Sequence, residues 1–482
     1  MTELAAAARA GNRRRWIALG VVCLAMFMNT IDGSVVNVAL PAIQTDLGIA
    51  QSDLTWVVNA YLITFGSFLL LAGRLGDLVG RKRVFLSGVT LFTLASVLCG
   101  LAQDEKLLIA ARFIQGLGGA VSSSVIIAMI VSEFPEPAER AKAMSAYIFV
   151  AVGGGSVGLL VGGVVTQAID WHWIFFINIP IGAVTLLLGR ALLEESEPLG
   201  LDKGVDVLGS IAVTTALMLG IYAIVTTPDH GWASAHTLLY GGAALGLMAV
   251  FIALQARIEN PIMPLRILRV QGLASTSLVR GLLATGLFST FFLGALYLER
   301  VRGYSALRTG IAFLPLSLAV GVLSAGITAR LMSRFGARRV MLPGLVLTAL
   351  GLLLMSRVGE HSSYFPTMLA ALLMLGLGAG TAFIPLLAIA MAHVPSADAG
   401  LASGIVNVSL QMSGAIGLAV LGTISTDHAR SLVAHGHSLP SALTSGYQLA
   451  FLVGASCVAL GAVLAFVMLR VPVPAQAGAK PS

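Results

Sequence analysis

A polar joint between two long apolar stretches reads GRLGDLVGRKR, from Gly73 to Arg83. It recurs 256 residues later as ARLMSRFGARR, from Ala329 to Arg339, again between apolar stretches. A repeat on this scale indicates two related halves, each a bundle of helices. The two joints therefore decide how the rest of the chain is divided.

The composition places the apolar stretches in a membrane. Of the 482 residues, 57% are hydrophobic and 11% are charged, and the mean hydropathy is +0.92. Soluble proteins carry about 25% charged residues. Apolar stretches of roughly 20 residues, long enough for a bilayer core of ~30 Å, recur along the chain. We therefore predict an all-α polytopic membrane protein.

The length of one half predicts two extra helices. We place the spans at 16–38, 54–73, 83–102, 107–131, 142–168, 173–193, 207–226, 237–256, 272–298, 307–329, 339–357, 366–391, 400–424 and 446–469. One half, 16–193, takes 178 residues, so the 256-residue offset leaves room for two more helices. The prediction is two six-helix bundles plus two additional central helices, fourteen spans in all.

The domains and their orientation follow from these spans. They are a cytoplasmic tail (1–15), the N-terminal bundle (16–193), a cytoplasmic linker (194–206), two inserted helices (207–256), a second cytoplasmic linker (257–271), the C-terminal bundle (272–469) and a cytoplasmic tail (470–482). With a cytoplasmic N-terminus, 21 of the 29 Lys and Arg residues lie on the inner side and six on the outer side. This excess of inner cations predicts that both termini are cytoplasmic.

Several other classes of protein are excluded. The net charge of +7 is distributed according to the predicted membrane topology, so it does not indicate a nucleic-acid partner. The three cysteines lie in apolar stretches, and no histidine group within a span has metal-ligand spacing, so no disulfide or metal site is predicted. The chain also lacks the Walker pattern of ATPases. We predict neither enzymatic activity nor a cofactor.

Two charges within the first bundle call for a partner or a function. A charged side chain inside a span costs at least ~2.5–3.5 kcal/mol. Asp32 lies nine residues before Pro41, and Arg112 lies five residues into its span, at depths of roughly 14 and 8 Å from the outer surface. Their long side chains can close that gap. A buried carboxyl beside an arginine is also suited to bind and release a proton.

Small residues mark two places of close approach. Gly73, Gly76 and Gly80 permit a tight cytoplasmic turn, next to the cations Arg81, Lys82 and Arg83 and to Asp77. In the fifth span, Gly154, Gly158 and Gly162 repeat every four residues and Gly163 adjoins them. That spacing lets helix backbones approach and slide.

These motifs resemble those of a known family. The loop from Gly73 is similar to the signature loop of the major facilitator superfamily. The segments Ile31–Pro41, Arg112–Gly119 and Trp171–Gly182 resemble motifs of its drug:proton antiporters with fourteen spans. One departure is Leu159, where the antiporter motif has proline after glycine, and this weakens the case for export over import.

The resemblance implies roles for particular residues. It implies a cytoplasmic gate at Gly73, Asp77, Gly80, Arg81 and Lys82, with Asp77 near Gly400 at the start of span 13, and a weaker latch in the second repeat, where Ser333 replaces the acid. It assigns the region of Asp32 and Arg112 to proton coupling. Two alternatives stay open, namely that Asp77 only forms the turn and that Asp32 and Arg112 form a static clamp or bind separate partners.

Other residues have weaker signals. Trp56, Tyr61 and Gln115 are candidates for a substrate path at the membrane midplane, although aromatic residues in spans often serve packing. Arg280, in the ninth span, has two interpretations. It attracts an anionic group in a cavity, or it extends its side chain to the cytoplasmic surface.

The predicted function is proton-coupled antiport, in which amphiphilic drugs or other small molecules leave the cytoplasm as two bundles rock about a central site. The alternative is a dedicated exporter of one metabolite, lipid or self-made antibiotic. The predicted location is the plasma membrane, and the predicted partners are small amphiphilic substrates, protons and the lipid bilayer. The sequence predicts no oligomeric state.

Overall fold

The computed structural model describes residues 2–49, 54, 56–195, 200, 206–258, 261, 263, 265–394 and 399–469. All regular structure in these residues is helical, which confirms the all-α prediction. The first half contains α1 (Thr2–Leu47), α2 (Trp56–Val79), α3 (Arg81–Gly100), α4 (Glu105–Glu133), α5 (Pro137–Ala168), α6 (Trp173–Phe176) and α7 (Asn178–Leu192). The inserted segment contains α8 (Val207–Val225), α9 (Thr227–His230) and α10 (Ala235–Gln255).

The second half contains more interrupted helices. It comprises η2 (Leu265–Arg269), α11 (Leu273–Leu296), η3 (Tyr297–Val301), α12 (Ala306–Val322), η4 (Leu323–Ile327), α13 (Thr328–Phe335), α14 (Ala337–Met355), η5 (Tyr364–Met368), α15 (Leu369–Met391), α16 (Ala399–Ala434) and α17 (Leu439–Met468). Within the described residues, eleven helices are long and apolar enough to cross a membrane. Shorter apolar helices lie in α8 and α12, and α16 covers the remaining predicted span, so the structure is consistent with fourteen.

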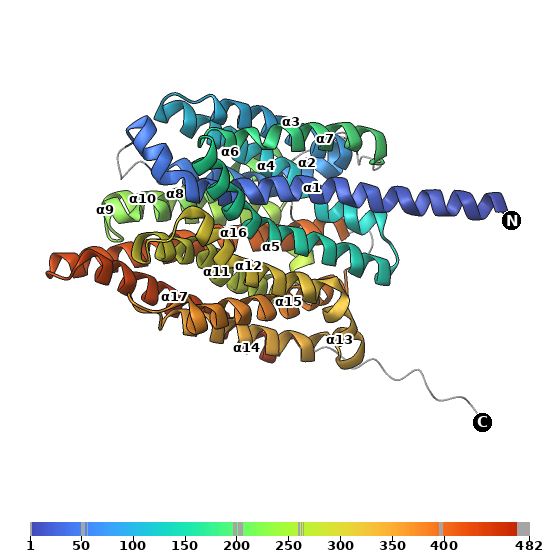
Figure 1. Ribbon diagram of the computed structural model, residues 1–482. Coiled ribbons are helices and arrows are strands. Elements are labelled where there is room, and N and C mark those ends of the chain that lie inside the picture. The colour runs from blue at the N-terminus through green and yellow to red at the C-terminus, as the bar shows by residue number, and fades with distance from the viewer. Residues whose placement is uncertain are drawn as a thin grey trace.

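The helices form two groups that lie side by side (Figure 1). α1 to α7 make one group and α11 to α17 the other, and they meet where α5 packs against α12 and where α16 packs against α2 and α4. The inserted helix α8 contacts both groups, through α2 and α16, while α10 packs on α8. The lipid-facing character of α10 is clear from Leu238, Leu239 and Leu245, each more than 60% exposed.

Several helix boundaries differ from the sequence prediction. α1 starts at Thr2 rather than at residue 16, because the alanine-rich segment before the span also favours helix. The predicted span 173–193 corresponds to α6 and α7 together, one apolar segment from Trp173 to Leu192, and Ile177 between them keeps helical angles (φ −54°, ψ −31°). The predicted span 307–329 ends in the π-helical turn η4, where Gly326 has a φ of +117°.

The internal repeat is visible in the geometry of the two joints. Gly80 and Gly336, which are 256 residues apart, both have positive φ, +114° and +84°, immediately before a helix. The Nζ of Lys82 donates to the carbonyls of Arg190 and Leu193 at 3.0 and 2.7 Å, and thereby caps the end of α7. Its counterpart Arg338 donates to the carbonyl of Phe466 near the end of α17. Each joint therefore ties the last helix of its own bundle.

The buried carboxylate of Asp206 connects the start of α8 with the end of α10. Asp206 caps α8 by accepting a hydrogen bond from the Gly209 N–H at 2.7 Å, and it also accepts one from the Gln255 amide at the end of α10. Gln255 in turn accepts from the Met263 N–H at 2.9 Å. This network joins both ends of the pair to the segment that leads into α11.

The glycine row of α5 is the surface on which α1 rests. A Cβ on Gly158 would lie 2.0 Å from the Ser34 Oγ and 2.9 Å from the Ile31 carbonyl, and a Cβ on Gly162 would lie 2.7 Å from Val35. On Gly154 it would lie 3.0 Å from Thr30. Gly163 is also buried in α5. Gly154, Gly158 and Gly162 therefore lie where α1 and α5 come close together, and the helix-packing role of the row stays a prediction.

Replacing Gly158 by valine should separate α1 from α5. Overpacking of this kind costs ~1–3 kcal/mol, so we expect a lower Tm for the detergent-solubilised protein. Gly153→Val is the matched control, because a Cβ there meets only Phe149, at 3.9 Å. Equal Tm values for the two variants would show that the row does not set the helix contact.

Candidate functional site: a buried charge network and the loop between α2 and α3

Asp32 and Arg112 form an ion pair in the centre of the first bundle. The Arg112 Nη1 contacts the Asp32 Oδ2, and the side chains of Arg112 and Asp32 are 1% and 0% exposed. Arg112 also donates from Nε to the Val57 carbonyl at 2.9 Å and from Nη1 to the Gln115 Oε1 at 2.7 Å. The structure therefore brings together the two charges that sequence analysis paired.

Two neutral residues complete the network around the carboxylate. Asp32 Oδ1 accepts hydrogen bonds from the Gln115 Nε2 at 2.7 Å and from the Asn178 Nδ2 at 3.0 Å. Both amides also donate to the Ser96 Oγ, at 2.8 and 3.3 Å. The roles of Ser96 and Asn178 were not predicted, since neutral polar residues in spans give only a weak signal.

The aromatic residues near the network separate into two environments. The Tyr61 ring lies 4.5 Å from the Arg112 Cζ and stacks on Phe65, so it forms a wall of the charge network. Trp56 instead contacts Tyr222 of α8, with 5.8 Å between ring centroids. Tyr61 and Gln115 are 4% and 0% exposed and belong to the network in this conformation. A substrate path along Trp56, Tyr61 and Gln115 stays a prediction.

The loop between α2 and α3 holds Asp77 and Arg81 as an ion pair. Asp77 pairs with Arg81 at 3.1 Å, one helical turn later, and Arg81 also donates to the Ala128 carbonyl and the Ser132 Oγ of α4, both at 3.4 Å. Ser333, the counterpart of Asp77, donates to the Arg330 carbonyl of its own helix. α16 packs against α2, but the contact of Asp77 with Gly400 stays a prediction.

Glycines allow the loop to fit closely. A Cβ on Gly76 would lie 2.3 Å from Val125 of α4, and Gly80 has a φ of +114°, which residues with a side chain rarely adopt. At Gly73 the nearest atom, of Ser124, would be 3.9 Å away, which is ordinary contact. Gly76 and Gly80 are therefore required by the geometry, whereas Gly73 is not.

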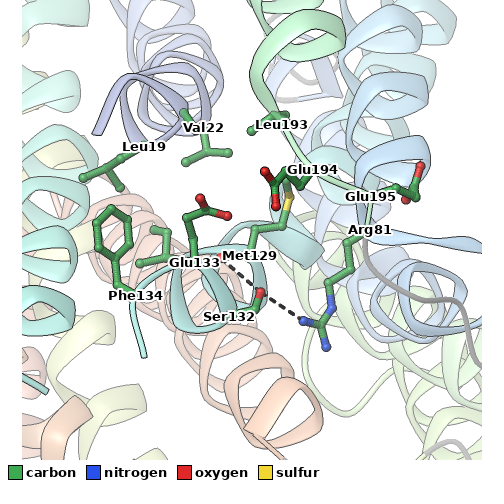
Figure 2. Close-up of a pocket in the computed structure, with 12 residues that line it drawn as sticks. Leu19, Val22, Arg81, Met129, Ser132, Glu133, Phe134, Leu193, Glu194 and Glu195 are labelled. Carbon is green, nitrogen blue, oxygen red and sulfur yellow. Dashed lines mark hydrogen bonds between the residues drawn. The ribbon is translucent and has the colours of Figure 1, made fainter. Parts of the chain in front are cut away.

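A pocket of about 190 Å³ lies beside this loop, at the inner ends of α1, α4 and α7. Figure 2 shows its apolar wall and the hydrogen bond from Arg81 to Ser132. Three carboxylates line it, those of Glu133, Glu194 and Glu195. Arg14 pairs with Glu194 at 2.9 Å. Val22 at this pocket and Asp32 are ten residues apart on α1, roughly 15 Å, so the two places are distinct.

The sequence matches the Major Facilitator Superfamily over residues 22–331 and 316–482. The chain belongs to this superfamily. It is thus a multi-pass membrane transporter, and the two helix groups are the two bundles of the major facilitator fold. The POT family transporter PepTSo has the same fold, with a TM-score of 0.64 at 17% identity over 93% of this chain and 98% of that one.

Relatives of this major facilitator protein include named resistance and export proteins. The puromycin resistance protein pur8 of Streptomyces alboniger is 35% identical, over 96% of this chain and 93% of its own length. The cephamycin export protein CmcT of Amycolatopsis lactamdurans is 34% identical, over 88% and 89%. The multidrug resistance protein Stp of Mycobacterium tuberculosis is 35% identical, over 86% and 76%.

The ion pair should dominate the stability of the first bundle of this major facilitator protein. Arg112→Met leaves the Asp32 carboxylate buried without its cation, which costs ~3–5 kcal/mol. The double variant Asp32→Asn with Arg112→Met removes both charges, so we expect its Tm to lie above that of Arg112→Met. The measurement is thermal unfolding of the detergent-solubilised protein. If the losses of stability in the single variants Asp32→Asn and Arg112→Met simply add in the double variant, the two residues are not energetically coupled.

Proposed function

We propose that this chain is a proton-coupled antiporter that exports amphiphilic drugs or other small molecules from the cytoplasm. The observation that carries the proposal is the enclosed Asp32 carboxylate, held by Arg112, Gln115 and Asn178. Burial favours the neutral acid while these donors favour the anion, so a change in either shifts its proton occupancy. Arg112 stays protonated, which leaves Asp32 as the proton carrier.

The proposed cycle is a rocking of the two bundles. The groups that hold Asp32 all belong to the first bundle, so the ion pair moves with that bundle as a unit. Outward exposure admits a proton to Asp32, and inward exposure releases it and admits substrate. The inward proton gradient supplies the energy. Asp77 and Arg81 are assigned to the cytoplasmic gate, where α2 meets α16.

A dedicated exporter is the second candidate. Three relatives are each named for one antibiotic, which is puromycin, cephamycin or tetracenomycin C. Stp is named for multidrug resistance. Both kinds of protein are similar to this chain over most of its length. The range of compounds moved by the purified protein separates the two candidates.

The coupling is tested in liposomes that enclose a pH-sensitive dye and carry a pH gradient. Ethidium or puromycin should dissipate the gradient through the wild-type protein, and Asp32→Asn should lower that rate at least tenfold, because the amide binds no proton. Asp104→Asn is the control, since Asp104 is exposed and caps α4, a position that asparagine also suits. Transport of the compound without proton movement would refute the coupling.

The proposed orientation is a plasma-membrane protein with fourteen spans and both termini in the cytoplasm. It places Gly231, between α8 and α10, outside and Ser333, before α14, inside. In intact cells, an impermeant maleimide should label Gly231→Cys but not Ser333→Cys, on a background without native cysteines. Lysed cells provide the control, because both should then react. Labelling of Ser333→Cys in intact cells would overturn the orientation.

A further inference from the structure

Arg280, on α11 of the second bundle, is a second buried arginine. It lies seven residues after Leu273, the first residue of α11, or roughly 10 Å along the helix axis. Its side chain is only 3% exposed. The structure therefore contradicts the interpretation in which Arg280 extends to the cytoplasmic surface, and leaves its cation inside the protein.

This cation has almost no partner. The Arg280 Nη1 reaches the Phe383 carbonyl at 3.4 Å, a long contact, and the Cζ lies 5.6 Å from the Phe383 ring. The buried Nε has no hydrogen-bond partner, and among the described residues no carboxylate lies within ion-pairing distance. Arg112, by contrast, is held by a carboxylate, an amide and a carbonyl. The chain thus neutralises one buried arginine and leaves the other open.

Two more unpartnered groups share the face of α11 on which Arg280 lies. Thr276 and Ser277 precede it by four and three residues, a spacing that puts side chains on one side of a helix. They are 0% and 6% exposed, and neither hydroxyl has a partner. Buried polar groups are normally hydrogen-bonded, so three such groups within one helical turn indicate an absent partner. That partner must accept hydrogen bonds and carry negative charge.

The helices around Arg280 lie near the boundary between the bundles. Phe383, whose ring lies beside the guanidinium, belongs to α15 of the second bundle, and α15 contacts α5 of the first. α11 also approaches α5, because a Cβ on Gly155 of α5 would lie 3.5 Å from Phe291. The Phe383 ring provides an apolar surface beside the cation.

We propose that Arg280, Thr276 and Ser277 form a binding subsite for the oxyanion group of an amphiphile, a carboxylate or a phosphate, with Phe383 against its apolar part. This inference rests on the proposed export function. It adds a class of substrate, namely amphiphiles that carry an oxyanion group. The source of the oxyanion is either a solute from the cytoplasm or a lipid headgroup.

The test measures binding of radiolabelled laurate to the full chain in phosphatidylcholine nanodiscs, with empty nanodiscs as the blank. We expect Arg280→Met to weaken laurate binding at least tenfold, because a charge-assisted hydrogen bond is lost. Arg280→Lys, which keeps the charge, should retain most of it. Arg308→Met is the control, since Arg308 is exposed and packs on Tyr304. Dodecylammonium, with the same chain length and opposite charge, should bind the wild type and Arg280→Met equally.

Two further measurements separate the alternatives. Competition by phosphatidylglycerol that depends on Arg280 identifies a lipid headgroup as the source, and its absence identifies a solute. The Tm without ligand should be unchanged or higher in Arg280→Met, because an unpaired buried charge is removed. Equal laurate binding by wild type and Arg280→Met, or a large loss of Tm in that variant, would overturn the proposal. Neither readout needs a proton gradient, so failure of proton coupling is detected separately.

Discussion

The constraint on which the first bundle depends is that a charge inside the membrane must be neutralised by the protein itself. Asp32 on α1 and Arg112 on α4 neutralise each other. Arg112 also donates a hydrogen bond to the Val57 carbonyl of α2, and Asp32 accepts one from the Asn178 amide of α7. The Ser96 hydroxyl of α3 accepts a hydrogen bond from the Asn178 amide. Five helices are thereby fixed to one another through a single carboxylate and its cation. Helices fastened in this way can move as one body.

The joints at Gly73–Arg83 and Ala329–Arg339 share part of their geometry. Both joints have a glycine with positive φ and a cation that caps the last helix of the same bundle, Lys82 in one and Arg338 in the other. These shared features belong to the closure of each half of this chain. The ion pair of Asp77 with Arg81 belongs to the first joint, because Ser333 and Ala337 occupy the corresponding positions of the second. Both joints therefore cap the last helix of their own bundle, and the first joint also carries the Asp77–Arg81 ion pair.

The sequence predicted those features whose energetic cost is large. Charges within spans are expensive enough to require partners, so Asp32 and Arg112 could be paired before any coordinates were known, and the glycine row of α5 was recognisable from its spacing. Ser96 and Asn178 were not, because neutral polar side chains in a span often bond to carbonyls of their own helix and so do not by themselves point to a distant partner. Arg280 was ambiguous because its side chain is long enough to reach either the surface or the interior.

The contact between the bundles has a different character from the interior of the first bundle. Gly310 and Gly321 of α12 bring the helix against Leu160 and Phe149 of α5, where an added Cβ would lie within 2.6 Å of existing atoms. Such contacts are van der Waals approaches, whose loss exposes no charge. The Asp32–Arg112 pair lies within the first bundle, whereas these α5–α12 contacts lie between the bundles. Parting of α5 from α12 therefore leaves in place the hydrogen bonds that hold Asp32 and Arg112. The first bundle can move against α12 without separating the two charges.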